Sequence, residues 1–203
     1  MYHTCKRLID ILLSAILIVL LVPVFIIIGI CVYCGSPGPV FYVHKRVGLN
    51  GKSIFIYKFR TMVPGADNLE LYLNDEDLEK FTTEYKLEDD PRITGVGRFL
   101  RHTSLDELPQ LLNILIGNMS FIGPRPIVQD ELKHYTEDGQ KLLLSVKPGL
   151  SGYWQVKGRG IASYESGDRQ RLELYYARNA SLMLDFKLFL MTFGTVLRGR
   201  GAM

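Results

Sequence analysis

The chain has 203 residues, which suffice for one domain with a sizeable core and leave too little for a second full-sized domain. The 24 Lys and Arg residues against 21 Asp and Glu residues give a net charge of only +3, so we expect no nucleic-acid partner. Three cysteines do not suggest a disulfide framework, and Cys31 and Cys34 lack the second pair of ligands that a zinc site needs.

The first feature along the chain is an uncharged apolar run from Ile11 to Tyr33. At about 1.5 Å per helical residue, a helix of this length can cross a bilayer core of roughly 30 Å. The run is longer than the apolar centre of a signal peptide, and no small-residue cleavage site follows it. We therefore predict a helix that stays in the mature protein and contacts membrane lipids.

Pro23 lies near the middle of this run, where it lacks an N–H group and collides with the carbonyl group of Val19. We expect the helix to bend or break there. Basic residues flank both ends of the run, and the positive-inside rule places each flank in the cytoplasm. A helix that folds back at Pro23 satisfies both flanks, whereas a kinked helix that spans the membrane once is the open alternative.

The next segment predicts a β-hairpin. Residues 41–48 and 53–62 alternate apolar with polar or basic residues, and Asn50-Gly51 between them is a strong turn signal. Lys58 and Arg60, two positions apart on the second strand, are expected to point to one face. An ordinary basic face in contact with solvent is the alternative interpretation.

The sequence SLDELPQLLN, Ser104 to Asn113, contains two adjacent carboxylates, Asp106 and Glu107. Ser104 followed by Glu107 matches a capping box, and Pro109 is tolerated near a helix start. We therefore expect a helix over about residues 106–116 whose buried side chains lie at helical spacing, namely Leu108, Leu111, Leu112 and Leu115. A carboxylate in the first turn of a helix can cap it and still point outward to react.

Cationic residues elsewhere in the sequence favour a chemical role for this pair. Arg101, Arg125, Lys58 and Arg60 are more cations than two capping carboxylates need, and Arg side chains suit phosphate oxygens. Mg²⁺ prefers one or two carboxylates together with phosphate oxygens, so the pattern indicates an anionic substrate with a bridging metal ion. The chain has no Walker loop and no G-x-S-x-G, which disfavours nucleoside triphosphate hydrolysis and the simplest serine hydrolases.

Two later segments are also distinctive. Residues Lys147 to Arg159 are rich in Gly and contain the one Trp, so we expect a shaped loop in which Tyr153 and Trp154 contact a ligand or pack in a hydrophobic hinge. Residues 181–197 are mostly apolar but carry Asp185 and Lys187, which predicts an interfacial or core helix rather than a second span.

Taken in order, the apolar segment with its central proline, YKFRTM, DDPRITGVGRFLRHTSLDELPQLLN, GNMSFIGPRP, KPGLSGYWQVKGR and SLMLDFK resemble the bacterial sugar transferase family, the small monotopic phosphoglycosyl transferases. The resemblance covers about residues 6–197. It implies transfer of a sugar 1-phosphate from a UDP-sugar to polyprenyl (undecaprenyl) phosphate with release of UMP, at the cytoplasmic face of the bacterial inner membrane, as the first membrane step of glycoconjugate assembly.

The resemblance also implies a fold. We expect an α+β, mostly helical protein with a re-entrant membrane helix hairpin over residues 1–36, and a small cytoplasmic, membrane-associated catalytic domain over residues 37–203 with interfacial amphipathic helices. Many members of the family have Ser-Pro at the hinge, where this chain has Val22-Pro23.

By the same resemblance, Asp106 is the nucleophile of a ping-pong reaction through a covalent aspartyl phosphosugar. Glu107 helps to hold Mg²⁺ with Asp106 or takes a proton from the incoming phosphate. Arg101, Arg125 and Lys58 bind phosphate oxygens, and Asp185 is a further substrate-binding candidate or a buried partner for an arginine.

Two other hypotheses stay open from the sequence. A non-catalytic membrane scaffold would bind anionic lipid headgroups through the basic strand face and would not need Asp106 or a metal ion. A lipid-phosphate hydrolase would complete the reaction with water and release free sugar phosphate without an acceptor.

Overall fold

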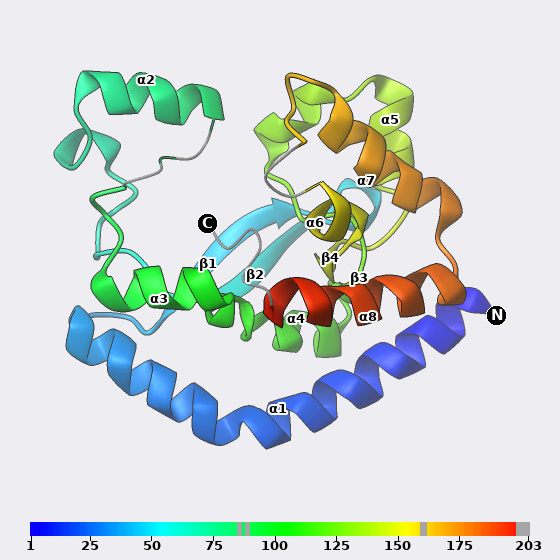
Figure 1. The fold of residues 1–203 in the computed structure, drawn as a ribbon, viewed down its shortest axis with the longest axis horizontal. Coiled ribbons are helices and arrows are strands. Elements are labelled where there is room, and N and C mark those ends of the chain that lie inside the picture. The colour runs from blue at the N-terminus through cyan, green and yellow to red at the C-terminus, as the bar shows by residue number, and fades with distance from the viewer. Residues whose placement is uncertain (85–86, 88–89, 159–161, 198–203) are drawn as a thin grey trace.

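The computed structural model describes residues 1–84, 87, 90–158 and 162–197, and within them the protein is mostly helical with two small sheets (Figure 1). The mostly helical α+β prediction is confirmed. The helices and strands are α1 (Tyr2–Gly35), β1 (Phe41–Val47), β2 (Ser53–Phe59), α2 (Asp75–Glu84), α3 (Gly95–Thr103), α4 (Gln110–Ile116), β3 (Ser120–Ile122), α5 (Glu137–Leu143), β4 (Gly149–Ser151), α6 (Tyr153–Lys157), α7 (Asp168–Asn179) and α8 (Leu182–Leu197).

The predicted hairpin is confirmed. Strands β1 and β2 pair antiparallel, with Phe41 opposite Phe59 and Val47 opposite Ser53. At the tip, Asn50 and Gly51 adopt positive φ angles of 54° and 75°, the conformation that Asn-Gly favours in tight turns. Strands β3 and β4 form a second, parallel pair. The main core cluster includes residues of β2 and β3 together with residues of the helices, namely Ile54, Ile56, Leu111, Ile114, Met119, Phe121, Ile122, Tyr176 and Leu188.

Helix α1 runs as one bent helix along the base of the molecule in Figure 1. Pro23 lies inside it, and the chain bends near the middle of α1 without leaving the helix. The helix is long and apolar enough to cross a membrane, and only 11% of its most apolar window is buried inside the protein. Because the core helix of a soluble protein would be mostly buried, this exposure favours contact with lipid.

The N-terminal end of α1 is bonded to the rest of the protein through polar side chains. Lys6 forms an ion pair of 2.6 Å with Asp185 on α8. Arg7 donates hydrogen bonds to the carbonyl oxygens of Ile114 and Leu115, the last turn of α4. Asp10 is buried and accepts hydrogen bonds from the Ser120 hydroxyl and from a backbone N–H of β3.

The C-terminal end of α1 is attached by apolar packing. Ile28 and Val32 form a buried cluster with Phe59 of β2 and Leu100 of α3. Both ends of one apolar helix therefore contact the same folded body.

Helix α8 has an inner and an outer face, as expected for an interfacial helix. Asp185 and Leu188 are buried, whereas four large apolar side chains are exposed, namely Leu182, Met183, Phe186 and Leu190. Figure 1 shows α8 above α1, and the exposed apolar side chains of the two helices indicate a membrane-facing surface.

The helix predicted over residues 106–116 begins later than expected. The acidic pair lies in a short 3₁₀ turn, Leu105–Glu107, and α4 begins at Gln110 behind Pro109. Leu111 is buried as predicted, Leu108 and Leu115 are half-buried, and Leu112 is exposed. Asn113 and Ile114 face the interior instead. Helix α2 carries three acidic residues in its first turn, and the residues 85, 86, 88 and 89 that follow it lie outside the described part of the chain.

Helix α3 approaches the end of the hairpin at a glycine. A Cβ atom built on Gly97 would lie 1.9 Å from the backbone oxygen of Thr61, so only glycine allows this approach. The Thr94 side chain caps the helix by accepting from the Gly97 N–H group. One consequence is that Arg101, one turn further on, donates from Nε to the Thr61 hydroxyl at 2.9 Å.

We expect Gly97→Ala to lower the free energy of unfolding by about 2 kcal/mol or more, because the contact is with backbone and cannot be relieved by a side-chain rotation. Gly95→Ala in the same helix is the matched control, since a Cβ atom there meets nothing within 4 Å. Chemical unfolding in detergent micelles, followed by Trp154 fluorescence, measures both variants. Equal stabilities of the two variants would contradict the close approach.

We expect the free energy of unfolding to depend on pH through Glu173 on α7. Glu173 is 1% exposed, its carboxylate accepts the backbone N–H of Arg125, and burial raises its pKa from 4.5 to about 7. As the pH rises, the unfolded chain loses this proton first, so the folded state should lose stability between about pH 4.5 and 7, by at most about 1.4 kcal/mol per pH unit. The same unfolding assay should show a flatter pH profile for Glu173→Gln, and an unchanged profile would refute the assignment.

Candidate active site

The acidic pair lies between α3 and α4, on a turn that does not match the predicted capping box. Ser104 ends α3 in the left-handed conformation, with φ 58°, and its N–H group donates to carbonyl oxygens of α3. Its side chain makes no capping hydrogen bond to the following turn. The capping prediction was wrong because Ser104 belongs to the end of α3. Asp106 and Glu107 are therefore not held in a capping box with Ser104.

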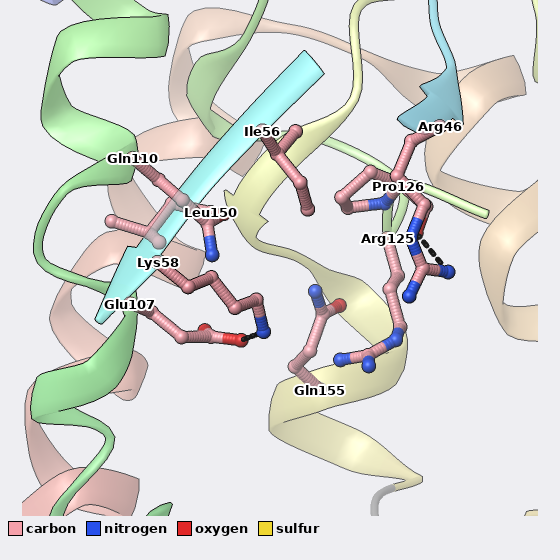
Figure 2. Close-up of a pocket in the computed structure, with 10 residues that line it drawn as sticks. Arg46, Ile56, Lys58, Glu107, Gln110, Arg125, Pro126, Leu150 and Gln155 are labelled. Atoms are coloured by element: carbon pink, nitrogen blue, oxygen red, sulfur yellow. Dashed lines mark hydrogen bonds and ion pairs between the residues drawn. The ribbon is translucent and has the colours of Figure 1, made fainter. Parts of the chain in front are cut away.

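Lys58 on β2 points at both carboxylates. Its Nζ atom lies 2.6 Å from Oε1 of Glu107 and 3.9 Å from Oδ2 of Asp106, and Figure 2 shows the contact with Glu107. Arg60, which the sequence places on the same face as Lys58, instead donates to the backbone oxygen of Ser36. The hairpin thus contributes one cation to the acidic pair and uses the other to fix the segment after α1.

Asn113 fixes the distance between the hairpin and the acidic turn. Its side chain is fully buried, donates to the Phe55 carbonyl oxygen at 2.6 Å and accepts from the Tyr57 N–H group at 3.0 Å. These two bonds join α4 to the backbone of β2 one residue before Lys58. Because a buried backbone group without a partner is costly, the bonds hold the helix and the strand in one register.

Asp106 is the buried member of the pair, with 8% of its surface exposed. Burial raises the pKa of Asp106 to about 6, and the positive charges of Lys58 and Arg101 oppose the rise while the charge of Glu107 adds to it. Arg101 is itself largely enclosed, and burial lowers its pKa. The structure therefore brings together four of the six predicted site residues, Lys58, Arg101, Asp106 and Glu107.

Arg125 lines the opposite wall of a small pocket that also contains Lys58 and Glu107. Figure 2 shows Gln155 of α6 reaching into the space between Arg125 and Lys58. The pocket has about 10 Å³ of free space, room for about one water molecule. A larger ligand can enter only if these side chains move apart.

Sequence reasoning missed Arg46 and Gln155 on this wall. Burial and the nearby charge of Arg125 lower the pKa of Arg46 to about 10. Among the described residues, the buried Nε atom of Arg46 and the buried Oε1 atom of Gln155 have no hydrogen-bond partner, although the Arg46 guanidinium group pairs with Glu131 at 3.3 Å. Gln155 lies within the Gly-rich segment that the sequence singled out, whereas Arg46 carried no signal beyond its positive charge.

The predicted Lys147 to Arg159 loop folds as strand β4 and helix α6 as far as residue 158, and Arg159 lies outside the described residues. The guanidinium group of Arg169 lies 4.3 Å from the centre of the Trp154 ring, and that of Arg125 lies 5.8 Å from it. Trp154 thus packs against Arg169 and lies near Arg125 of the pocket wall, and its contact with a ligand stays a prediction.

Asp185 is not among the residues that line the pocket. Its carboxylate pairs with Lys6 and accepts hydrogen bonds from the hydroxyl groups of Tyr176, at 2.6 Å, and Tyr2, at 3.0 Å. The structure therefore shows the helix-end role that the sequence left open for Asp185, with a lysine rather than an arginine as partner.

The sequence profile of the family described as bacterial sugar transferase matches residues 1–199. The exopolysaccharide production protein ExoY of Sinorhizobium fredii is 40% identical over 97% of this chain and 87% of its own length.

Two longer relatives carry a reaction in their names. The undecaprenyl-phosphate galactose phosphotransferase of Salmonella typhimurium is 43% identical over 97% of this chain. The UDP-glucose:undecaprenyl-phosphate glucose-1-phosphate transferase of Escherichia coli is 38% identical over 92% of it. The chain spans 41% and 39% of the lengths of these two proteins. The chain belongs to the bacterial sugar transferase family and is an enzyme of the phosphoglycosyl transferase class.

Proposed function

We propose that the protein transfers a sugar 1-phosphate from a UDP-sugar to a polyprenyl phosphate, through a covalent bond between the sugar phosphate and Asp106. The observation that carries the proposal is the buried carboxylate of Asp106. Its pKa is raised, and it lies beside the carboxylate of Glu107 and near the cations Lys58 and Arg101. Such a group is poorly solvated and close to ligand-binding cations, as an active-site nucleophile requires.

In the first half-reaction, an oxygen of the ionised Asp106 attacks the phosphorus that carries the sugar. The bond from this phosphorus to the bridging oxygen breaks, and UMP leaves with the electron pair and the negative charge. The product is an aspartyl phosphosugar. Lys58, Arg101 and Arg125 bind phosphate oxygens and offset the charge that the reacting groups bring together.

In the second half-reaction, a phosphate oxygen of the polyprenyl phosphate attacks the same phosphorus. The bond to Asp106 breaks, the carboxylate is regenerated, and polyprenyl-diphosphate sugar is released. Splitting the transfer lets one pocket with little free space serve a soluble donor and a lipid acceptor in turn. Glu107 either takes a proton from the acceptor phosphate or holds the metal ion.

Mg²⁺ is the proposed cofactor, and the donor set fits it. Asp106 and Glu107 are adjacent carboxylates, and the described residues contain no cluster of three or more His, Cys, Asp or Glu side chains that would form a closed protein site. Mg²⁺ is commonly held by one or two carboxylates with substrate phosphates and water as the remaining ligands. When bound, the ion would neutralise the diphosphate and polarise the reacting phosphoryl group.

We further propose that α1 is re-entrant, so that the protein is monotopic at the cytoplasmic face of the bacterial inner membrane. The bend near the middle of α1 and the attachment of both its ends to one body support this topology over a single span. On this proposal, residues 1–36 form the membrane segment and residues 37–203 the catalytic domain. The active site then lies close to the lipid acceptor.

We expect the purified protein, incubated with a panel of UDP-sugars and Mg²⁺ in the absence of acceptor, to gain the mass of one phosphosugar on the peptide that contains Asp106. Asp106→Asn should show no adduct, because an amide is a far weaker nucleophile, and removal of Mg²⁺ with a chelator should also abolish it. Peptide mass spectrometry measures the adduct and identifies the sugar.

Asp138→Asn is the matched control, since Asp138 is an exposed carboxylate on α5 and should leave the adduct unchanged. An adduct on a different peptide of the wild-type chain would refute the role of Asp106. So would an adduct of wild-type yield in Asp106→Asn.

A further inference from the structure

A second cavity, larger than the catalytic pocket, lies at the N-terminal end of α1. It encloses about 370 Å³ between the first turns of α1, the hairpin tip, the segment that follows α5, and Tyr176. None of its lining residues also lines the catalytic pocket. The reaction proposed above does not use this cavity.

The wall of this cavity is positively charged. Lys6, Arg7 and Lys147 line it, and the one acidic side chain among its described lining residues is Asp10, which already accepts hydrogen bonds from β3. Lys6 is paired with Asp185, whereas Arg7 donates to two neutral carbonyl groups. Burial lowers the pKa of Lys147, and the nearby charge of Arg7 lowers it further. The excess of positive charge favours the binding of an anion in this cavity.

The position of the cavity indicates where such an anion comes from. Directly after Lys6 and Arg7, the exposed surface of α1 becomes apolar at Leu8, Ile9 and Leu12. The cavity therefore lies at the boundary between the polar and apolar parts of α1, which is the level of lipid headgroups beside a membrane-inserted helix.

We propose that this cavity binds a phosphate ester, with Lys147 and Arg7 as its cationic ligands, and that its position favours the headgroup of an anionic phospholipid. A cavity of about 370 Å³ is far larger than inorganic phosphate needs and accommodates a phosphoglycerol group. Binding there would fix the membrane depth of α1 at its N-terminal end. The cavity shares no lining residue with the pocket in which the transfer reaction is proposed to take place.

The test uses the full chain in detergent micelles, titrated with short-chain phosphatidylglycerol, short-chain phosphatidylcholine or glycerol 3-phosphate. Thermal unfolding and native mass spectrometry report binding without any measurement of catalysis. We expect phosphatidylglycerol to bind more tightly than phosphatidylcholine. Lys147→Gln should weaken phosphatidylglycerol binding about tenfold, because it removes one charge-assisted contact.

Lys141→Gln is the matched control, since Lys141 is an exposed lysine on the neighbouring helix α5 and should bind like the wild type. Lys147→Arg, which keeps the charge, should also retain binding. Tight binding of glycerol 3-phosphate alone, lost in Lys147→Gln, would support the site and assign it to a soluble phosphate ester. Equal binding of the two lipids, or equal binding by Lys147→Gln and Lys141→Gln, would overturn the proposal.

Discussion

The active site depends on the register between strand β2 and the turn that carries the acidic pair. The buried Asn113 side chain sets this register by hydrogen bonding to the Phe55 carbonyl oxygen and the Tyr57 N–H group of β2. Lys58 is thereby held 2.6 Å from Glu107 and 3.9 Å from Asp106. If this register were lost, Asp106 would lose the charge of Lys58, which favours its ionised form. The ionised carboxylate that the proposed attack needs would then be less populated.

The free space around this cluster also affects the proposed mechanism. The free space between these side chains is only about the size of one water molecule, so the cations lie close together and would act jointly on a bound phosphate. The nearby charge of Arg125 lowers the pKa of Arg46, so an anionic ligand bound beside these two arginines would offset this repulsion. We expect Gln155 and Arg125 to move when the donor binds.

Local sequence patterns predicted the hairpin and the apolar helix with its bend. The grouping of Lys58 and Arg101 with the acidic pair was inferred from the charges present and from the family resemblance. Local patterns could not show that Ser104 ends the preceding helix, because that depends on a left-handed backbone angle. They also missed contacts between distant segments. Asp185 pairs with a lysine 179 positions away, and Arg46 joins the pocket wall only once the hairpin folds against the rest of the chain.

The central claim is that Asp106 holds the phosphosugar after UMP has left and before any lipid acceptor is bound. Isotope exchange tests it directly: the enzyme is given a UDP-sugar, Mg²⁺ and labelled UMP, with no polyprenyl phosphate present. The account predicts that label appears in the UDP-sugar and that Asp106→Asn shows no exchange. If label enters the UDP-sugar only when the acceptor is added, both substrates must be bound together and the covalent mechanism is contradicted.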